Sequence, residues 1–216
     1  MFRRSSHYLY VPLAFAAMLV GEQVAKRRSW WRAGVAVCAV LGAATIARTT
    51  HYASDDALWG PEVAAVPECR EGQFYLGHAA QKRRAWAEAA RCYELAAEPP
   101  RDFVAYADRA SALQNLGVVR LEQEQFSDAA RAFEAALEAT GDERTRRELT
   151  HNLATAEFRA ANPTRAARLL ESEVARQDAF PESIALRARA LHMLGRDREA
   201  AALIDRLSKV RPPPNR

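Results

Sequence analysis

The stretch AARAFEAA at residues 129–136 is one of four variants of a single eight-residue sequence. The others read AARCYELA at 89–96, AARLLESE at 166–173 and AAALIDRL at 200–207. Their starts lie 40, 37 and 34 residues apart, a period typical of helical solenoids. One such unit cannot bury its apolar face alone, so the units are expected to stack. The sequence therefore predicts an all-α chain that contains an α-solenoid.

The predicted array covers residues 69–211 and consists of about four helix pairs. Each pair is bounded by turn or helix-breaking residues such as Gly141, Pro163 and Gly195. The expected pairs are 70–83 with 86–98, 102–123 with 127–139, 143–161 with 164–177, and 182–194 with 197–209. Three successive prolines predict a disordered tail over 212–216. Strands are not expected, because no region alternates apolar and polar residues with period two.

The spacing of small and aromatic residues resembles the tetratricopeptide repeat family, whose pattern is W-x2-L-G-x2-Y…A-x3-F…P. The clearest matches are Leu76, Gly77, Ala89, Tyr93 and Ala96 in the first unit and Leu116, Gly117, Ala129, Phe133 and Ala136 in the second. The consensus Trp is absent. The resemblance implies that small residues let two helices touch, that the aromatic residue fills the space between units, and that a peptide binds along the concave face.

Two apolar segments, 8–20 and 33–47, precede the array, with Lys26, Arg27, Arg28 and Arg32 between them. We expect a two-helix membrane hairpin over 1–47 that contacts the membrane through residues 8–47. Under the positive-inside rule, residues 26–32 are cytoplasmic and the array is periplasmic at a bacterial inner membrane. Two alternatives stay open, namely a signal peptide or single anchor, and two soluble helices. Residues 48–68 form a junction with two helix breakers, Pro61 and Pro67.

Residues 7–77 resemble a second family, the transmembrane, tetratricopeptide-containing O-mannosyltransferase-like proteins. The resemblance starts at Tyr8-Leu9-Tyr10-Val11-Pro12 and continues through Arg48, Leu58 and Trp59 in the same order. It implies that this chain corresponds to the last two membrane spans and the repeats. The family's catalytic acidic residues lie in an early loop that has no counterpart in this sequence.

Charge and motifs exclude several classes of function. The net charge of +4 divides into +3 for residues 1–67 and +1 for the rest, so no nucleic-acid partner is expected. Cys38, Cys69 and Cys92 form no C-x-x-C pair, and a disulfide between the last two is disfavoured by a separation of about 12 Å. The pair Asp55-Asp56 is interpreted as a helix cap. We expect no metal, no cofactor and no active site, and hence no enzyme.

The tetratricopeptide resemblance places a peptide groove on the first helix of each pair. The residues at its positions are Phe74, His78, Gln81, Gln114, Val118, Leu121, His151, Thr155, Phe158, Ala185, Arg189 and His192. The Lys and Asn pattern of the family's carboxylate clamp is missing. The leading hypothesis is a membrane-anchored scaffold that recruits protein partners outside the cytoplasm. The alternatives are an accessory subunit of a multi-span, lipid-linked sugar transferase, and a soluble adaptor.

Overall fold

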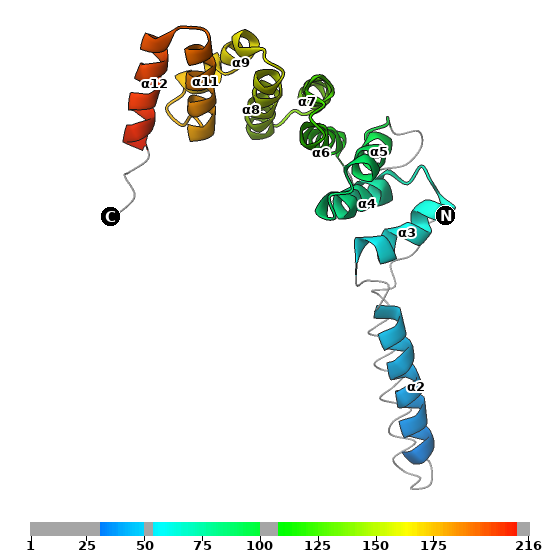
Figure 1. Ribbon diagram of the computed structural model, residues 1–216. Coiled ribbons are helices and arrows are strands. Elements are labelled where there is room, and N and C mark those ends of the chain that lie inside the picture. Colours follow the sequence, from blue (N-terminus) through cyan, green and yellow to red (C-terminus); the bar gives the residue numbers. More distant parts are fainter. Residues whose placement is uncertain (1–30, 50–53, 100–107, 211–216) are drawn as a thin grey trace. The chain divides into compact units, whose positions relative to one another are not determined.

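The computed structural model describes residues 31–49, 54–99 and 108–210, and these contain eleven helices and no strand. Figure 1 shows them labelled α2 to α12. The chain divides into two compact units, Met1–Ala57 and Leu58–Arg216. The prediction of an all-α chain with about four stacked helix pairs is confirmed for the described residues.

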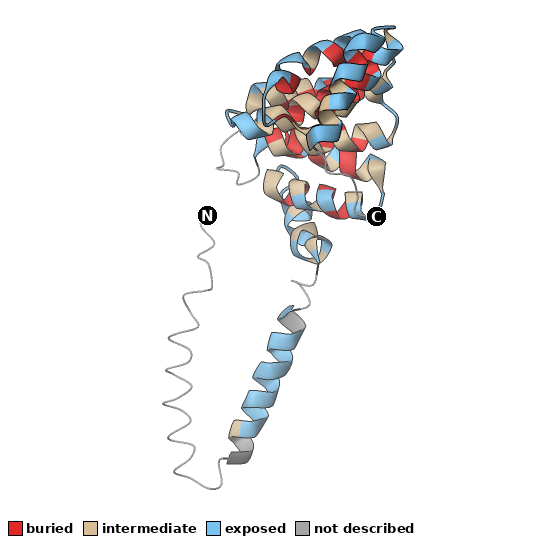
Figure 2. Cartoon of the chain, turned by 90° about the vertical axis from the view of Figure 1, so that its left-hand side faces the viewer, coloured by how far each residue is buried: buried red, intermediate tan, exposed pale blue. Residues whose placement is uncertain are grey.

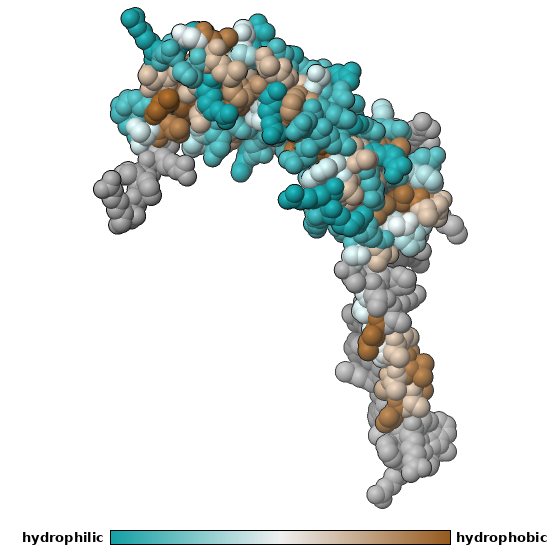
Figure 3. Space-filling model, in the orientation of Figure 1, coloured by the Kyte–Doolittle hydropathy of each residue, from teal (hydrophilic) through white to brown (hydrophobic). Residues whose placement is uncertain are grey.

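The first unit contains α2, Trp31–Thr49, which covers the second predicted apolar segment. Its large apolar side chains, among them Val35, Val40 and Ile46, are 57–69% exposed, and the helix is coloured as exposed along most of its length in Figure 2. In Figure 3 its surface is predominantly apolar, whereas the visible surface of the array is mostly hydrophilic. A helix that is apolar on all sides is normally buried, either in the core of a protein or in a membrane.

The predicted membrane hairpin is not found among the described residues. Its first segment, 8–20, lies outside them, and none of the described helices is both long and apolar enough to cross a membrane. The physical reason is length, because the apolar part of α2 over 33–47 is about 22 Å long at 1.5 Å per residue. The hydrocarbon core of a bilayer is about 30 Å thick.

The second unit begins within α3, Asp55–Ala65, a helix that the sequence analysis did not predict in the junction. Ser54 caps it, because its Oγ accepts the N–H of Ala57 at 3.2 Å, and Pro61 lies inside it. The ring of Trp59 stacks on Tyr75 of the next helix, with centroids 5.3 Å apart. Trp59 therefore packs on the first helix of the array.

Four helix pairs follow α3. They are α4 (Arg70–Lys82) with α5 (Trp86–Ala96), α6 (Arg109–Glu122) with α7 (Phe126–Ala139), α8 (Glu143–Arg159) with α9 (Pro163–Leu169) and α10 (Glu171–Ala175), and α11 (Pro181–Met193) with α12 (Asp197–Val210). The second helix of each of the first three pairs also packs on the first helix of the next pair. The array is therefore continuous from α4 to α12 (Figure 1).

Two of these elements differ from the sequence prediction. The first helix of the second pair begins at Arg109, not near 102, because the Asp108 carboxylate accepts the N–H of Ser111 and caps it. Residues 100–107 lie outside the described residues. The single helix expected over 164–177 is interrupted at Leu170, so α9 and α10 are separate.

The turn inside each pair has the same backbone geometry. In each turn, the second residue after the first helix has a positive φ between 58° and 71°. These residues are Arg84, Glu124, Ala161 and Gly195. The N–H of the residue that follows donates to the carbonyl of the residue five positions earlier, at 2.9 Å in all four turns. This bond and the left-handed residue define a Schellman motif, which ends a helix and satisfies its last carbonyls. Only the fourth turn uses the glycine that the sequence analysis identified.

The core is built from the repeated eight-residue sequences. Their first residues Ala89, Ala129 and Ala166 are fully buried, and so are the fifth residues Tyr93, Phe133 and Leu170. Buried residues line the contacts between helices throughout the array (Figure 2).

Glycine makes the closest of these contacts possible. A Cβ on Gly77 would lie 2.9 Å from the Tyr93 ring, and one on Gly117 would lie 2.5 Å from the Phe133 ring. The implied role of the small residues, which is to let helices touch, is therefore confirmed in these two pairs. Burial raises the pKa of Tyr93 to about 12, and its hydroxyl donates to Gln81 Oε1 at 2.7 Å.

Arginine side chains donate hydrogen bonds to the last carbonyls of the second helices α5 and α7. Arg70 Nε donates to the Ala96 carbonyl at 2.9 Å, and Arg109 Nε donates to that of Ala97 at 3.0 Å. Arg146 does the same for Leu137 at 3.0 Å. The last carbonyls of a helix lack intrahelical partners and carry the negative end of its dipole, so a cation there satisfies both.

Candidate functional site

The first helices α4, α6, α8 and α11 carry the predicted groove residues, and several of these contribute to the interior. The Phe74 ring packs edge-on against Tyr75 and Tyr93, with centroids 5.6 and 5.9 Å away. Val118 and Leu121 are partly buried against the same core cluster. These three side chains hold neighbouring helices together.

The polar groove residues of the first two pairs are more accessible. His78 is exposed, and Gln114 is partly exposed. Gln81 accepts the hydrogen bond from Tyr93, which links the two helices of the first pair. None of these residues converges with others into a described pocket or charged cluster.

His151 links two units. Its Nδ1 lies 3.0 Å from the Oγ of Ser183 on α11, and Ser183 is fully buried. Burial lowers the pKa of His151, with Glu182 and Glu173 acting in the opposite direction. The Thr155 hydroxyl donates to the His151 carbonyl at 3.0 Å. His151 therefore holds the third and fourth units together.

Arg189 and His192 are exposed groove residues of the fourth unit, and Phe158 of the third unit is half-buried against the core beside them. We call these three residues the Phe158 site. The Arg189 guanidinium lies 4.9 Å above the Phe158 ring centroid, a cation–π contact between α8 and α11. Arg189 has no hydrogen bond or ion pair to any described residue, so its N–H donors stay available. His192 is exposed, and its Nδ1 lies 2.6 Å from Asp197 Oδ1. The site offers an apolar ring beside unused donors.

An ion cluster built on the buried Glu173 lies near the N-terminal ends of α8 and α11, about three helical turns from this site. The sequence analysis missed it. Arg147 of α8 donates through Nε and Nη2 to the two carboxylate oxygens of Glu173, both at 2.8 Å. Its Nη1 also bonds Asp178 at 2.9 Å, and its guanidinium lies 4.4 Å above the Phe180 ring. The Glu173 side chain is only 4% exposed.

The electrostatics of the cluster follow from this geometry. Hydrogen bonds from Arg147 hold the pKa of Glu173 below its ordinary value, and the N–H of Phe180 adds to the effect. One signal in the sequence identifies Glu173. It is the eighth residue of the third repeated sequence, where the other three have Ala or Leu.

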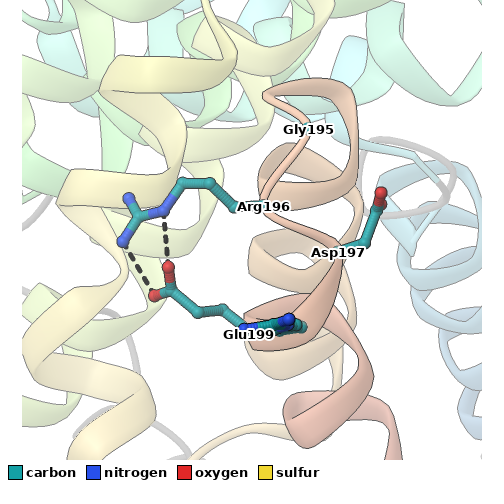
Figure 4. Close-up of a pocket in the computed structure, with 5 residues that line it drawn as sticks. Gly195, Arg196, Asp197 and Glu199 are labelled. Carbon is teal, nitrogen blue, oxygen red and sulfur yellow. Dashed lines mark hydrogen bonds and ion pairs between the residues drawn. The ribbon is translucent and has the colours of Figure 1, made fainter.

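The turn between α11 and α12 forms a depression lined by five consecutive residues, 195–199. Figure 4 shows Arg196 and Glu199 bound to each other, and the structure gives 2.7 Å for both of their contacts. Asp197 points away from that pair. All of the lining residues come from this one turn, and the one printed contact beyond it joins Asp197 to His192 of α11 at 2.6 Å. No group of His, Cys, Asp and Glu suited to a metal ion occurs among the described residues.

These features resemble those of a tetratricopeptide repeat array, with paired helices, a glycine beneath a large ring in the first two pairs and a first-helix face that carries exposed side chains. Residues 112–147 match the model of the tetratricopeptide repeat family. No curated protein matches the chain in sequence.

Solved structures share the fold. MamA is 14% identical over 75% of this chain and 91% of its own, with a TM-score of 0.62. YrrB, described as a TPR protein with an unusual peptide-binding site, is 18% identical over 70% and 73%, with a TM-score of 0.55. PilF of Pseudomonas aeruginosa is 17% identical over 92% of both chains, with a TM-score of 0.53. At these identities the likeness concerns the fold alone. Nothing in the comparisons supports the resemblance to O-mannosyltransferase-like proteins.

Proposed function

We propose that this chain is a tetratricopeptide scaffold that binds a protein or peptide partner on its first-helix face and has no catalytic activity of its own. The Phe158 site carries the proposal. There an aromatic ring and an arginine with unused donors come from adjacent units, and interface energy commonly concentrates in such residues.

The chemistry of the site indicates the kind of segment that it binds. An apolar side chain of the partner packs on the Phe158 ring. A carboxylate or carbonyl oxygen of the same segment accepts from Arg189, because a guanidinium presents its donors in a fixed fork. The partner is therefore a segment with one apolar and one oxygen-bearing anchor.

Replacing Phe158, Arg189 and His192 together with Ala is expected to reduce partner capture by about tenfold or more. Capture is measured by affinity purification from detergent-solubilised membranes, with mass spectrometry of the co-purifying proteins. The circular dichroism spectrum should stay close to that of the native chain. The melting temperature should fall only because the half-buried Phe158 ring is lost from the core, since Arg189 and His192 are exposed.

A matched control replaces the exposed arginines at the third position of the repeated sequences, Arg91, Arg131 and Arg168, with Ala. They lie on second helices, so capture should be unaffected. If capture survives the first triple replacement, the partner binds elsewhere, on the second helices, the junction around Trp59 or the apolar segment.

We also propose that residues 8–47 associate with a bacterial inner membrane, with residues 26–32 in the cytoplasm and the array in the periplasm. The exposed apolar side chains on all sides of α2 favour this proposal, since water is a poor solvent for such a helix. The four basic residues between the two apolar segments favour the orientation.

Membrane association and orientation are tested on a chain whose native cysteines are replaced by Ser. Single cysteines are placed at Ser29, between the apolar segments, and at Ser208, in α12. We expect the chain to resist carbonate extraction. A membrane-impermeant maleimide should label Ser208→Cys in cells with a permeabilised outer membrane, and Ser29→Cys only after lysis. The reverse labelling pattern would show that the orientation is opposite to the proposed one. Release of the chain by carbonate would show that residues 8–47 do not anchor it in the membrane.

A further inference from the structure

A second arginine repeats the contact that Arg189 makes in the Phe158 site. Arg159, the last residue of α8, has its guanidinium 5.6 Å from the centroid of the Phe126 ring, and Phe126 is the first residue of α7. Arg189 of α11 lies 4.9 Å from the Phe158 centroid in the same way. In both contacts, an arginine on the first helix of one unit therefore lies over a phenylalanine ring of the preceding unit.

Both of these arginines keep their N–H donors free. Arg159 and Arg189 are exposed, and neither has a hydrogen bond or an ion pair to any described residue. Stacking uses only the face of a guanidinium, so its five in-plane donors stay available. Arg147 behaves differently, because it also lies over a ring but gives its donors to Glu173 and Asp178. The two exposed arginines are thus held in place by rings and are not neutralised by a bonded acid.

The two arginines lie on the groove side of neighbouring helices. Arg159 follows the predicted groove residue Thr155 by four positions, and Arg189 follows Ala185 by four, so each shares the side of its helix that carries the groove. Helices α8 and α11 begin consecutive pairs (Figure 1) and contact each other. Each guanidinium lies over a ring of the preceding unit, so the two stay about one helix spacing apart, or about 10 Å.

We propose that the partner segment is acidic and extended, and that it places one carboxylate on Arg159 and a second on Arg189. This inference rests on the proposed function and adds Arg159 to the Phe158 site as a second binding residue. A carboxylate fits the guanidinium fork, and side chains already held by rings lose little freedom on binding. Asp197, which also contacts the site, bonds His192 and not Arg189.

The separation of the two guanidiniums determines the spacing of the acids. A polyproline II segment rises 3.1 Å per residue and returns to the same side every third residue, so acids at such positions lie about 9 Å apart. This distance matches the separation of the two arginines. The expected motif therefore has two acidic residues with two others between them, one of which is apolar and packs on the Phe158 ring.

The test measures the binding of a fluorescent probe peptide to the full chain in a mild detergent, by fluorescence anisotropy. The probe has two glutamates three positions apart, with a leucine and a proline between them, and its control has glutamines in place of the glutamates. We expect a Kd of about 1–100 µM for the acidic probe at low salt. The glutamine probe should bind about tenfold more weakly or less, and added salt should weaken only the acidic probe.

The variant Arg159→Gln should weaken binding of the acidic probe by about fivefold or more and leave the glutamine probe nearly unaffected, because only the acidic probe has a charge to lose. The matched control is Arg168→Gln, which removes the same charge from an exposed position of α9 on a second helix. Binding of both probes to this control should equal that of the native chain. Both variants should melt close to the native temperature, since both arginines are exposed.

Three results overturn the proposal. They are equal affinity for the two probes, no binding of the acidic probe at about 1 mM, and native affinity in Arg159→Gln. Partner capture separates this inference from the proposed function. If capture is lost when the Phe158 site is replaced but Arg159→Gln leaves it intact, the scaffold function stands and only the acidic second contact is wrong. Capture that survives replacement of the Phe158 site overturns the proposed function, and this inference with it.

Discussion

Replacing Ala129 with Trp is expected to destabilise the array by about 3 kcal/mol, near the upper end of the usual cost of overpacking. Ala129 is the first residue of the second repeated sequence and is fully buried in α7. An indole has no room there unless α7 moves away from its neighbours, and Phe133 and Ala136 on the same face would lose contact with them. The free energy of unfolding is measured by urea denaturation.

The matched control is Ala87→Trp, which places the same indole on an exposed position of α5 and should change stability by about 0.5 kcal/mol or less. A melting temperature of Ala129→Trp within error of the native value would show that α7 packs in another register.

Replacing Glu173 with Gln is expected to cost up to about 3 kcal/mol, because it removes the buried partner of Arg147 and leaves only the exposed Asp178 as its counter-charge. The two 2.8 Å bonds between Arg147 and Glu173 join α8 to α10, and the Phe180 N–H that Glu173 Oε1 accepts at 3.1 Å leads into α11. The loss should therefore appear as separate melting of the fourth unit, detectable by hydrogen exchange in α11 and α12. Glu148→Gln is the control. Its partner Arg144 is 84% exposed, and such pairs contribute about 1 kcal/mol at most.

The same pair predicts a pH dependence. Arg147 lowers the pKa of Glu173 in the folded chain, whereas an unperturbed Glu has a pKa of about 4.3. The unfolded chain thus takes up the proton first as the pH falls. The stabilisation is present above about pH 4.3 and is lost as the pH falls through the folded pKa. The stabilities of the native chain and Glu173→Gln, measured by urea denaturation from neutral to acid pH, should converge at the acid end. A constant difference would show that Glu173 does not act through its charge.

Much of the array could be predicted because its signals are local. The expected helix over 70–83 is observed as Arg70–Lys82, and that over 197–209 as Asp197–Val210. Alanine favours helix at each position separately, and a repeated sequence places the same residues on the same helix face in every unit. Elements that depend on partners far along the chain were missed. Helix α3 is one, where Trp59 stacks on Tyr75, and the break at Leu170, next to the Arg147–Glu173 pair, is another.

By itself the sequence determined the repeat, the pairing of helices and the residues that lie on the first helices, since these follow from a period of 3.6 residues and from the positions of helix-ending residues. Only the tertiary structure decided which of those side chains are accessible. Phe74 and Phe158 are both groove residues of first helices and both are half-buried, yet Phe74 packs among aromatic rings while Phe158 meets Arg189. Tyr93 and Ile204 occupy the same position of the repeated sequence, yet one is fully buried and the other 58% exposed. A helix pattern states which side a residue faces, but burial depends on whether another helix lies against that side.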